Sequence, residues 1–509
     1  MKFMQTHKVY LTPISPIHIG CGEDFEPTNY VIDGTTLFHF DPANLALNTS
    51  QKTELLNCIN RLDLLAIQRF FLKNKEQAVS SAYYFADVAE GLAADYKNKV
   101  GKVAQRENDG NKVINNLSIE RTAFLPVKHL PYIPGSSFKG ALATALLDNA
   151  HQAKNNPKVG KNDHGKLLKE YIGEFADSKL RFVKFSDFSP RIPAESKIYY
   201  ALNFKKKVGK SGGEGRAMAL RRECISQGQY RAFLSELVLL QNDQNRMQIA
   251  DYFSLLKKFY LPIFKQEAEL LADRNLVSRQ YLKQLEQLFN LPNVALIRLG
   301  KNGADSKTYQ ADGIAQIKIM GAKGTPPSFK DSSTTVWLAG ANQAQQNDLL
   351  PFGWAILEVD PTTENGVLKQ WCETQPKSNF DRTSILAKRE AHKAEQIRLQ
   401  AEEIAKQQAK LAEEKAKAEM LNSLSDNQRL VMDFVEKLNE TRERQADNTG
   451  SPLLKEAEAL INQATEWDIT DRQFVFEQIT PDFLKSKIDF KKKDTEKNVK
   501  KWRNKLGIE

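Results

Sequence analysis

Apolar and polar residues alternate along several short stretches of the first 360 residues, with the period of two that is typical of β-strands. The clearest of these stretches are residues 8–14, 180–185, 197–204 and 294–298. Two apolar runs within 30–40 meet at Asp33-Gly34, which favours a tight hairpin turn. Residues 217–225 and 349–359 add two more predicted strands, 230–239 fits a strand or a helix, and 108–120 fits a loop or short hairpin.

Helical periodicity interrupts these strands twice. Residues 53–107 carry a broad apolar face that includes Leu55, Ile59 and Leu62, and long helices are predicted near 243–259 and 265–289. We therefore expect residues 1–370 to form an α+β core with helical insertions near 53–107 and 243–289.

The composition changes abruptly at residue 381, after which no Gly or Pro occurs until Gly450. Residues 381–424 predict a long charged helix. Ile397, Ile404 and Leu411 are seven residues apart, but polar residues interrupt the seam, so a solvated single helix is favoured over a coiled coil. Residues 425–509 predict a small helical domain with a basic tail, which makes this C-terminal extension all-α.

Charge and cysteine content narrow the possible partners. Lys and Arg number 73 against 63 Asp and Glu, a net charge of +10 that is compatible with a polyanionic partner. The four cysteines are far apart without a C-x-x-C pair, so neither a disulfide framework nor a metal site is predicted. The chain has no run of 18 apolar residues. We expect a cytoplasmic protein with no cofactor and no membrane partner.

One stretch has the chemistry of an anion-binding corner. Two prolines precede Gly135 and prevent a helix there, while the residues after Ser137 have helical spacing. Gly135 allows close backbone approach, Ser136 or Ser137 can cap the helix, and Lys139 adds a positive charge one turn later. The corner fits a phosphate, and the competing interpretation is a well-capped helix without a ligand.

Two further glycine-bearing turns carry basic residues. Lys210 lies in Gly209-Lys-Ser, but the glycine that a phosphate-binding P-loop needs is replaced by Phe204, so we reject a nucleotide site. This loop either stays in solvent or closes over a polyanion. The other turn follows the predicted strand at 294–298 and contains the basic residues Arg298, Lys301 and Lys307.

The stretch Pro131-Tyr-Ile-Pro-Gly-Ser-Ser-Phe-Lys-Gly-Ala-Leu resembles the signature of the RAMP superfamily of CRISPR effector subunits, whose cores are ferredoxin-like (RRM-like). Other blocks resemble the Csm-type subunit that caps the far end of type III-A complexes: residues 11–20, 26–32, 298–303 and 350–354. The similarity spans residues 8–359, and 381–509 has no counterpart.

The resemblance implies a non-catalytic subunit that binds the 3′ part of the CRISPR RNA, ends the filament of backbone subunits and supports 3′-end maturation and antiviral defence. Its implied partners are CRISPR RNA, target RNA, backbone and small Csm subunits, and recruited cellular ribonucleases. Single-stranded RNA held in this way needs phosphate contacts along a groove. The predicted RNA-binding residues are His18, Gly20, Gly135, Ser136, Ser137, Lys139, Lys210, Arg298, Lys301 and Lys307.

Two alternatives compete with this interpretation. Some relatives are endoribonucleases that process CRISPR RNA with a general acid/base histidine, for which His18 is the candidate, although the sequence offers it no partner. Asp24 and Asp33 are weak candidates for a catalytic loop aspartate, since turn geometry explains Asp33. A structural helical adaptor rests on residues 381–464 alone and leaves the glycine turns unexplained.

Overall fold

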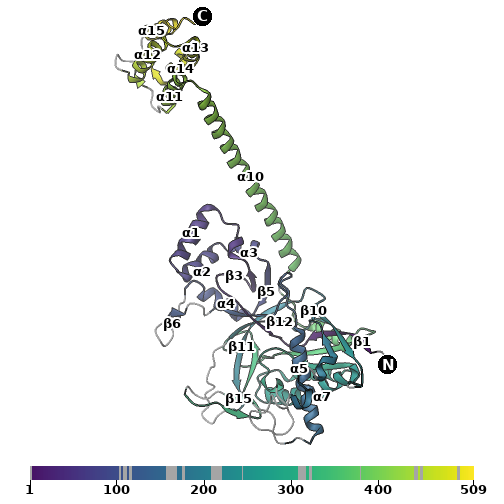
Figure 1. Cartoon of the computed structure of the whole chain (residues 1–509). Helices are drawn as coiled ribbons and strands as arrows, with labels where there is room; N and C mark the ends of the chain where they lie inside the picture. Colours follow the sequence, from purple (N-terminus) through teal and green to yellow (C-terminus); the bar gives the residue numbers. More distant parts are fainter. Residues whose placement is uncertain are drawn as a thin grey trace. The chain divides into compact units, whose positions relative to one another are not determined.

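The computed structural model describes residues 3–508 apart from 103–104, 107–111, 114–116, 156, 158–168, 175–177, 208–219, 244, 308–316, 320–323, 379, 441–444, 447–450 and 490–492. The chain divides into two compact units, Met1–Ala394 (unit 1) and Glu395–Glu509 (unit 2). Unit 1 contains two sheets and the helices that pack on them, and unit 2 is largely helical (Figure 1).

The first sheet of unit 1 has the order β10-β13-β1-β19-β14, with β9 also paired to β13. Its strands are β1 (Met4–Pro13), β9 (Val183–Phe185), β10 (Ser189–Pro190), β13 (Phe233–Leu240), β14 (Val294–Arg298) and β19 (Trp354–Val359). Strands β1 and β14 are both antiparallel to β19, with Pro13 opposite Ala355 and Arg298 opposite Trp354. The turns that follow β1 and β14 therefore leave the sheet at the same edge, although they are almost 300 residues apart in sequence.

The second sheet has the order β2-β8-β12-β11-β5-β4-β3, and β17 joins it through β11 and β18. Its strands are β2 (Gly20–Phe25), β3 (Tyr30–Asp33), β4 (Thr36–His39), β5 (Tyr84–Val88), β8 (Ile119–Thr122), β11 (Ser196–Lys205), β12 (Leu220–Ile225), β17 (Thr335–Gly340) and β18 (Leu350–Pro351). Asp33 pairs with Thr36 across the β3–β4 turn, so the predicted hairpin is confirmed. The segment 230–239, left open between strand and helix, forms β13.

The helical stretch predicted over 53–107 is wrong in one part. It contains α1 (Thr49–Asn60), α2 (Leu64–Lys73), α3 (Lys75–Ser81) and α4 (Glu90–Lys99), but β5 lies between α3 and α4, and the short strand β6 (Gln105–Arg106) lies at its end. The residues of β5 are buried throughout and pair with β4 and β11. Aromatic and β-branched residues favour this pleated, buried position over a helix.

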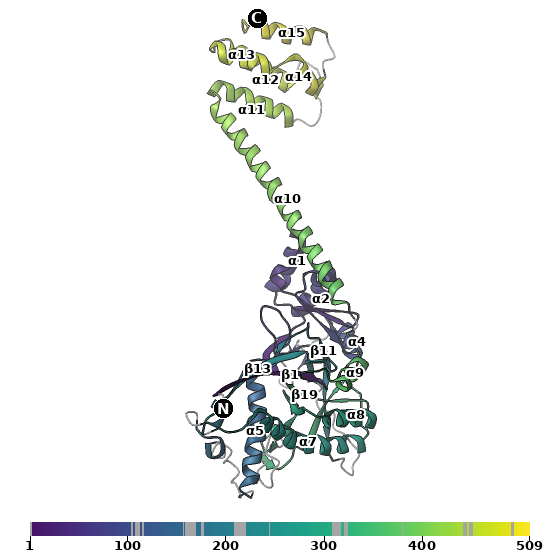
Figure 2. The same cartoon turned by 90° about the vertical axis from the view of Figure 1, so that its right-hand side faces the viewer.

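Three further helices of unit 1 are α5 (Gly135–Ala153), α7 (Ile249–Asp273) and α8 (Arg279–Phe289). Helices α5 and α7 lie side by side, and the Tyr260 hydroxyl of α7 donates to the Ala141 carbonyl of α5 at 3.3 Å (Figures 1 and 2). The break predicted between 259 and 265 is absent, because α7 continues through Pro262. Burial of residues such as Tyr260 and Phe264 on both sides of this proline offsets the lost backbone hydrogen bond.

Unit 2 has its own hydrophobic core. Helix α10 (Arg382–Ser423) begins in unit 1 and ends in unit 2, where α11 (Asp426–Glu440), α12 (Pro452–Ala464), α13 (Ile469–Gln478), α14 (Pro481–Lys487) and α15 (Lys493–Asn504) follow. Short strands β20 (Gln445–Ala446) and β21 (Ile488–Asp489) pair in parallel. In Figure 2, α11 and α15 lie on opposite sides of the other three. Buried residues from all five of these helices meet in one cluster, including Val431, Leu460, Val475, Leu484 and Val499.

The predicted α+β class with a helical C-terminal region is confirmed, whereas the ferredoxin-like topology and the domain limits stay predictions. Short elements complete the described chain: η1 (Pro42–Asn44), β6 (Gln105–Arg106), β7 (Lys112–Val113), η2 (Lys179–Phe182), η3 (Ala304–Lys307), β15 (Ile317–Ile319), β16 (Ser328–Lys330) and α9 (Gly366–Thr374). Within the described residues, no helix combines the length and apolar character needed to cross a membrane.

Candidate functional site

A cavity of about 400 Å³ lies where three segments distant in sequence meet in unit 1. The turn after β1, the first turns of α5 and the turn after β14 all contribute to its wall, together with Tyr260 of α7. The cavity gathers five of the predicted site residues: Gly20, Ser136, Ser137, Arg298 and Lys301. The shared exit of β1 and β14 from the first sheet explains why two of these turns meet.

The two glycine turns are in direct backbone contact. The Lys301 amide donates to the His18 carbonyl at 2.9 Å. Gly300 has a φ of +80°, and a Cβ added there would lie 2.2 Å from the His18 carbonyl oxygen, so both the conformation and the space require glycine. A Cβ on Gly20 would lie 2.9 Å from the Lys301 ammonium, so this glycine leaves the space that the lysine side chain occupies.

Glu120 of β8 holds the Lys301 side chain in place beside the two glycine turns. Its carboxylate accepts from Lys301 Nζ at 2.8 Å and from Arg222 Nη2 of β12 at 3.1 Å, and it lies 3.4 Å from His18 Nε2. The contact with His18, followed by those with Arg222 and Lys301, holds the pKa of Glu120 well below its usual range. The Lys301 side chain is still half-exposed, so its charge can face a ligand.

His18 itself is fully buried. Its Nδ1 donates to the Glu223 carbonyl at 2.7 Å, and Nε2 faces the Glu120 carboxylate. A side chain with no exposed surface cannot touch RNA or a substrate in this conformation. The burial of His18 does not fit the predicted contact with RNA. The ribonuclease alternative, which would use His18 as general acid/base, stays a prediction.

The start of α5 differs from the predicted capped corner. Helix α5 begins at Gly135 with Pro134 as the N-cap residue, whose side chain makes no capping hydrogen bond, so the expected cap from Ser136 or Ser137 is wrong. The Gly135 amide donates to Asp187 Oδ1 at 2.8 Å, and a Cβ on Gly135 would lie 2.8 Å from the Ser186 carbonyl. Gly135 therefore serves close packing and an internal carboxylate, and the exposed residue at this corner is Ser136.

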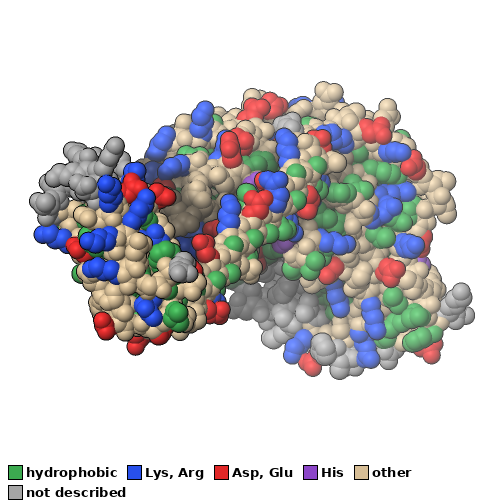
Figure 3. Space-filling view, turned by 90° about the horizontal axis from the view of Figure 1, so that it is seen from above, with side chains coloured by type: hydrophobic (Ala, Val, Ile, Leu, Met, Phe, Trp, Pro, Cys, Tyr) green, Lys and Arg blue, Asp and Glu red, His purple; other side chains and the backbone are tan. Residues whose placement is uncertain are grey.

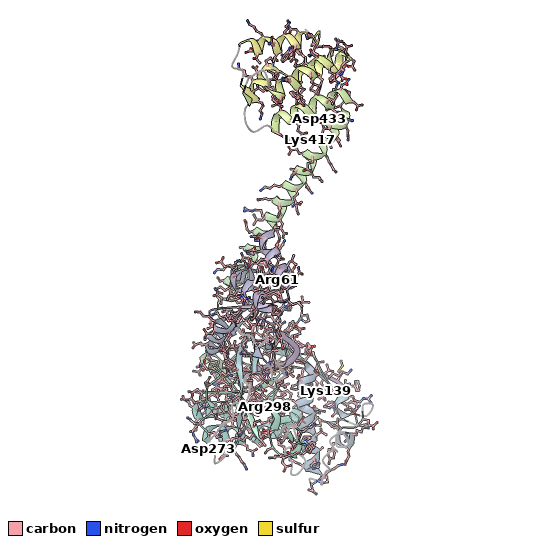
Figure 4. All side chains as sticks on the ribbon, turned by 90° about the vertical axis from the view of Figure 1, so that its left-hand side faces the viewer. Arg61, Lys139, Asp273, Arg298, Lys417 and Asp433 are labelled. Carbon is pink, nitrogen blue, oxygen red and sulfur yellow. The ribbon has the colours of Figure 1, made fainter. Side chains whose placement is uncertain are left out.

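Arg298 is also buried, contrary to the prediction that it contacts RNA. Its side chain is 3 % exposed and pairs with Glu267 of α7, with 2.6 Å between Nη1 and Oε2. Nε donates to the Phe352 carbonyl at 2.9 Å, and the guanidinium lies 4.8 Å from the Trp354 ring centre. This burial assigns Arg298 to the inner wall of the cavity, where it supports the following turn. Figure 4 labels Arg298 and Lys139 within unit 1.

A wider groove of about 830 Å³ adjoins the cavity, and Ser136 lines both. Lys139 of α5, Arg181 of η2 and Lys184 of β9 place three exposed basic side chains along this groove. On the face drawn in Figure 3, basic and acidic side chains are interspersed. The three basic side chains along the groove suit a phosphate chain.

Comparison with known proteins identifies the family of this chain. A family model of the RAMP superfamily matches residues 10–304, more than half of the chain. The chain belongs to the RAMP superfamily. The matched region contains the groove, both glycine turns and the residues that line the cavity apart from Ser306, whereas unit 2 of this RAMP protein lies outside it.

Two curated relatives carry the name CRISPR system Cms protein Csm5. The protein from Streptococcus thermophilus is 26 % identical over 242 residues, which are 44 % of this chain and 61 % of the relative. The protein from Methanocaldococcus jannaschii is 26 % identical over 215 residues, 40 % of this chain and 47 % of the relative. The RAMP chain thus matches about half to three-fifths of the length of these relatives.

Two solved structures are similar to this RAMP chain at low sequence identity. A chain of the cryo-EM structure of a Csm-crRNA-target RNA ternary complex has a TM-score of 0.41 and 16 % identity, covering 70 % of this chain and 100 % of its own. The crystal structure of T. onnurineus Csm5 has a TM-score of 0.41 and 15 % identity, covering 69 % and 100 %.

Sequence reasoning about this RAMP protein missed Glu120, Arg222, Arg181 and Lys184, which fall in strands or helical turns without a motif. The available signal was the charged pair Glu120-Arg121 inside the β run Ile119-Glu-Arg-Thr, because charged residues in a strand need partners when they are buried. Lys210 lies outside the described residues. Lys307 lies in η3, and its side chain is likewise not described.

Proposed function

We propose that this chain is a non-catalytic RNA-binding subunit of a type III-A (Csm) CRISPR effector complex. It binds the 3′ part of the CRISPR RNA, caps the filament of backbone subunits, and supports 3′-end maturation and antiviral defence. RAMP membership and the Csm5 names of the relatives favour this role. Its partners are CRISPR RNA, target RNA and the backbone and small subunits, with cellular ribonucleases recruited for trimming.

The observation that carries the proposal is the meeting of the cavity and the basic groove at Ser136. One phosphate lies at the cavity mouth against Lys301, whose position Glu120 fixes, and the backbone continues along the groove past Lys139. Such contacts bind single-stranded RNA through its charge and leave the base sequence unread. Cytoplasmic location follows from a role on a cellular RNA–protein complex.

The test measures retention of a labelled repeat-derived RNA by the full chain across a salt series. Each phosphate contact on a single strand contributes a slope of about −0.7 in the logarithm of affinity against the logarithm of salt concentration. Lys139→Gln with Lys301→Gln should therefore make the slope shallower by about 1.4, and Lys283→Gln on the exposed side of α8 should leave it unchanged. Equal slopes in all three proteins would refute the site.

Two further measurements test the role in the complex. Wild-type chain incubated with this RNA should leave it uncut with or without Mg²⁺, and cleavage would overturn the non-catalytic assignment. A complex reconstituted without the chain should lose nuclease protection at the 3′ end of its CRISPR RNA while the 5′ end stays protected. Loss at the 5′ end instead would place the subunit at the opposite end of the filament.

A further inference from the structure

Unit 2 needs an explanation of its own because it lies beyond the region that matches the RAMP family. It has a separate core, so its fold does not depend on packing against RAMP strands. Its last helix, α15, has two distinct sides. Thr495, Val499 and Leu506 are buried, and Trp502 is half-buried and packs against the same core.

Among the residues of α15 whose side chains the structure describes, 495–504, the exposed ones are lysines and asparagines. Lys497, Lys500 and Lys501 of α15 are exposed. Lys505, directly after the last helical residue Asn504, is exposed too, and its Nζ donates to Asn462 Oδ1 at 3.2 Å. At 100° per residue Lys497 and Lys501 fall on the side opposite the buried Val499, and Lys500 lies at the flank of that side. We call the four lysines the α15 lysine face.

Neighbouring charges extend this face and leave it strongly positive. Lys500 Nζ lies 2.9 Å from the Glu496 carboxylate, and Lys485 of α14 lies 3.8 Å from it. The hydrogen bond from Lys500, with the nearby charges, lowers the pKa of Glu496, which stays ionised at the edge of the face. One carboxylate thus faces lysines from two helices.

Ordinary solvation and helix polarity do not account for this pattern. The exposed helix α10 mixes both signs, and its Arg398 pairs with Glu395 and Glu402 one turn away. Like charges one turn apart destabilise a helix slightly, and α15 places Lys497 and Lys501 in that relation. Basic residues in the last turn favour the helix dipole, but Lys497 and Lys500 precede that turn. A polyanionic partner would relieve the repulsion.

We propose that the α15 lysine face binds the phosphate backbone of single-stranded RNA, as a second contact separate from the cavity of unit 1. The choice of RNA among polyanions rests on the proposed function of the chain. Lysine ammonium groups are point charges that neutralise phosphates without reading bases. The face therefore adds affinity for RNA of any sequence that extends beyond the first site.

The experiment uses the full chain and an unstructured, fluorescently labelled uridine-rich RNA, with binding followed by anisotropy over a salt series. The face variant is Lys497→Gln/Lys501→Gln/Lys505→Gln. The control, Lys406→Gln/Lys410→Gln/Lys415→Gln, removes the same charge from exposed positions of α10. The face variant should make the salt slope shallower by about 2, at about 0.7 for each contact, and the control should match wild type. Equal slopes in the face variant and the control would overturn the proposal.

Repeating the measurement in the Lys139→Gln/Lys301→Gln background separates this proposal from the proposed function. A loss caused by the face variant in both backgrounds supports an independent contact. If only the unit 1 substitutions weaken RNA binding, the lysine face is refuted and the proposed function stands. If only the face variant weakens RNA binding, the lysine face is supported and the unit 1 site of the proposed function is refuted. Retention on phosphatidylserine vesicles that the face variant abolishes, with RNA binding unchanged, would assign the face to a membrane surface and refute the proposal.

Discussion

Removing the carboxylate that pairs with Arg298 should destabilise unit 1 strongly. The side chains of Arg298 and Glu267 are 3 % and 11 % exposed, and 2.6 Å separates Nη1 from Oε2. Glu267→Ala leaves the guanidinium charged and without its carboxylate partner in a largely buried position. Glu267 also accepts from Trp354 Nε1 at 3.5 Å, so the indole loses its acceptor as well.

The structure also sets the size of this effect. Breaking a buried ion pair by removing one partner costs about 3–5 kcal/mol. Arg298 keeps the Phe352 carbonyl at 2.9 Å and the face of Trp354, which places the expected cost near the lower end, at about 3 kcal/mol. The double replacement Arg298→Met/Glu267→Leu removes both charges and retains apolar volume, so it should cost less than the single change.

Urea unfolding of the full chain, followed by tryptophan fluorescence, measures these differences, and the transition of unit 1 is fitted separately because two units need not unfold together. A control comes from the surface pair of Lys265 and Glu286, which are 53 % and 42 % exposed and lie 3.3 Å apart. Glu286→Ala should cost at most about 1 kcal/mol.

Two outcomes would refute this reasoning. A Glu267→Ala cost no larger than that of Glu286→Ala would show that the buried pair contributes no more than a surface pair. The double variant also tests whether Arg298 contacts RNA. If it shows a shallower salt slope for RNA than wild type, Arg298 contacts a phosphate after all.

The remaining predictions concern the glycine turns and a buried histidine. Gly300→Ala should destabilise unit 1 more than Gly20→Ala in urea unfolding, because the first meets the His18 backbone and the second meets the flexible end of Lys301; the reverse order would contradict the turn geometry. Burial, helped by nearby positive charge, lowers the pKa of His39 from 6.5 to about 3, so the unfolded chain takes up a proton that the folded chain refuses as the pH falls below 6.5. Stability present at pH 7 should fall by about 2 kcal/mol at pH 5 through this group, and urea midpoints of His39→Phe should lack that part of the loss; an equal loss in both proteins would exclude it.

Local patterns predicted the parts of the site that depend on short-range chemistry. The glycine turns after β1 and β14 were predicted at strand ends, and in the structure Gly20 lies against the Lys301 side chain and Gly300 against the His18 carbonyl. The two prolines before Gly135 indicated that no helix precedes it, and α5 begins at Gly135, although the expected serine cap is absent. These signals work because backbone conformation and helix initiation are set by a few neighbouring residues.

Long-range partners could not be predicted in the same way. Asp187 occupies the first amide of α5 from 52 positions away, and Glu267 neutralises Arg298 from a different helix. No pattern within either segment identifies such a partner, because strand order and helix packing bring them together. The continuity of α7 through Pro262 has the same origin, since burial on both sides overrides the local preference.

The carboxylate of Asp187 at the start of α5 has a consequence for selectivity. A lone inorganic phosphate or mononucleotide approaching this helix end meets a resident anion that already holds the Gly135 amide and repels a second negative charge. A polymer gains from many simultaneous lysine contacts and outweighs that repulsion, whereas a monomer does not. Under the proposed function, this corner should therefore bind an RNA strand in preference to free nucleotides.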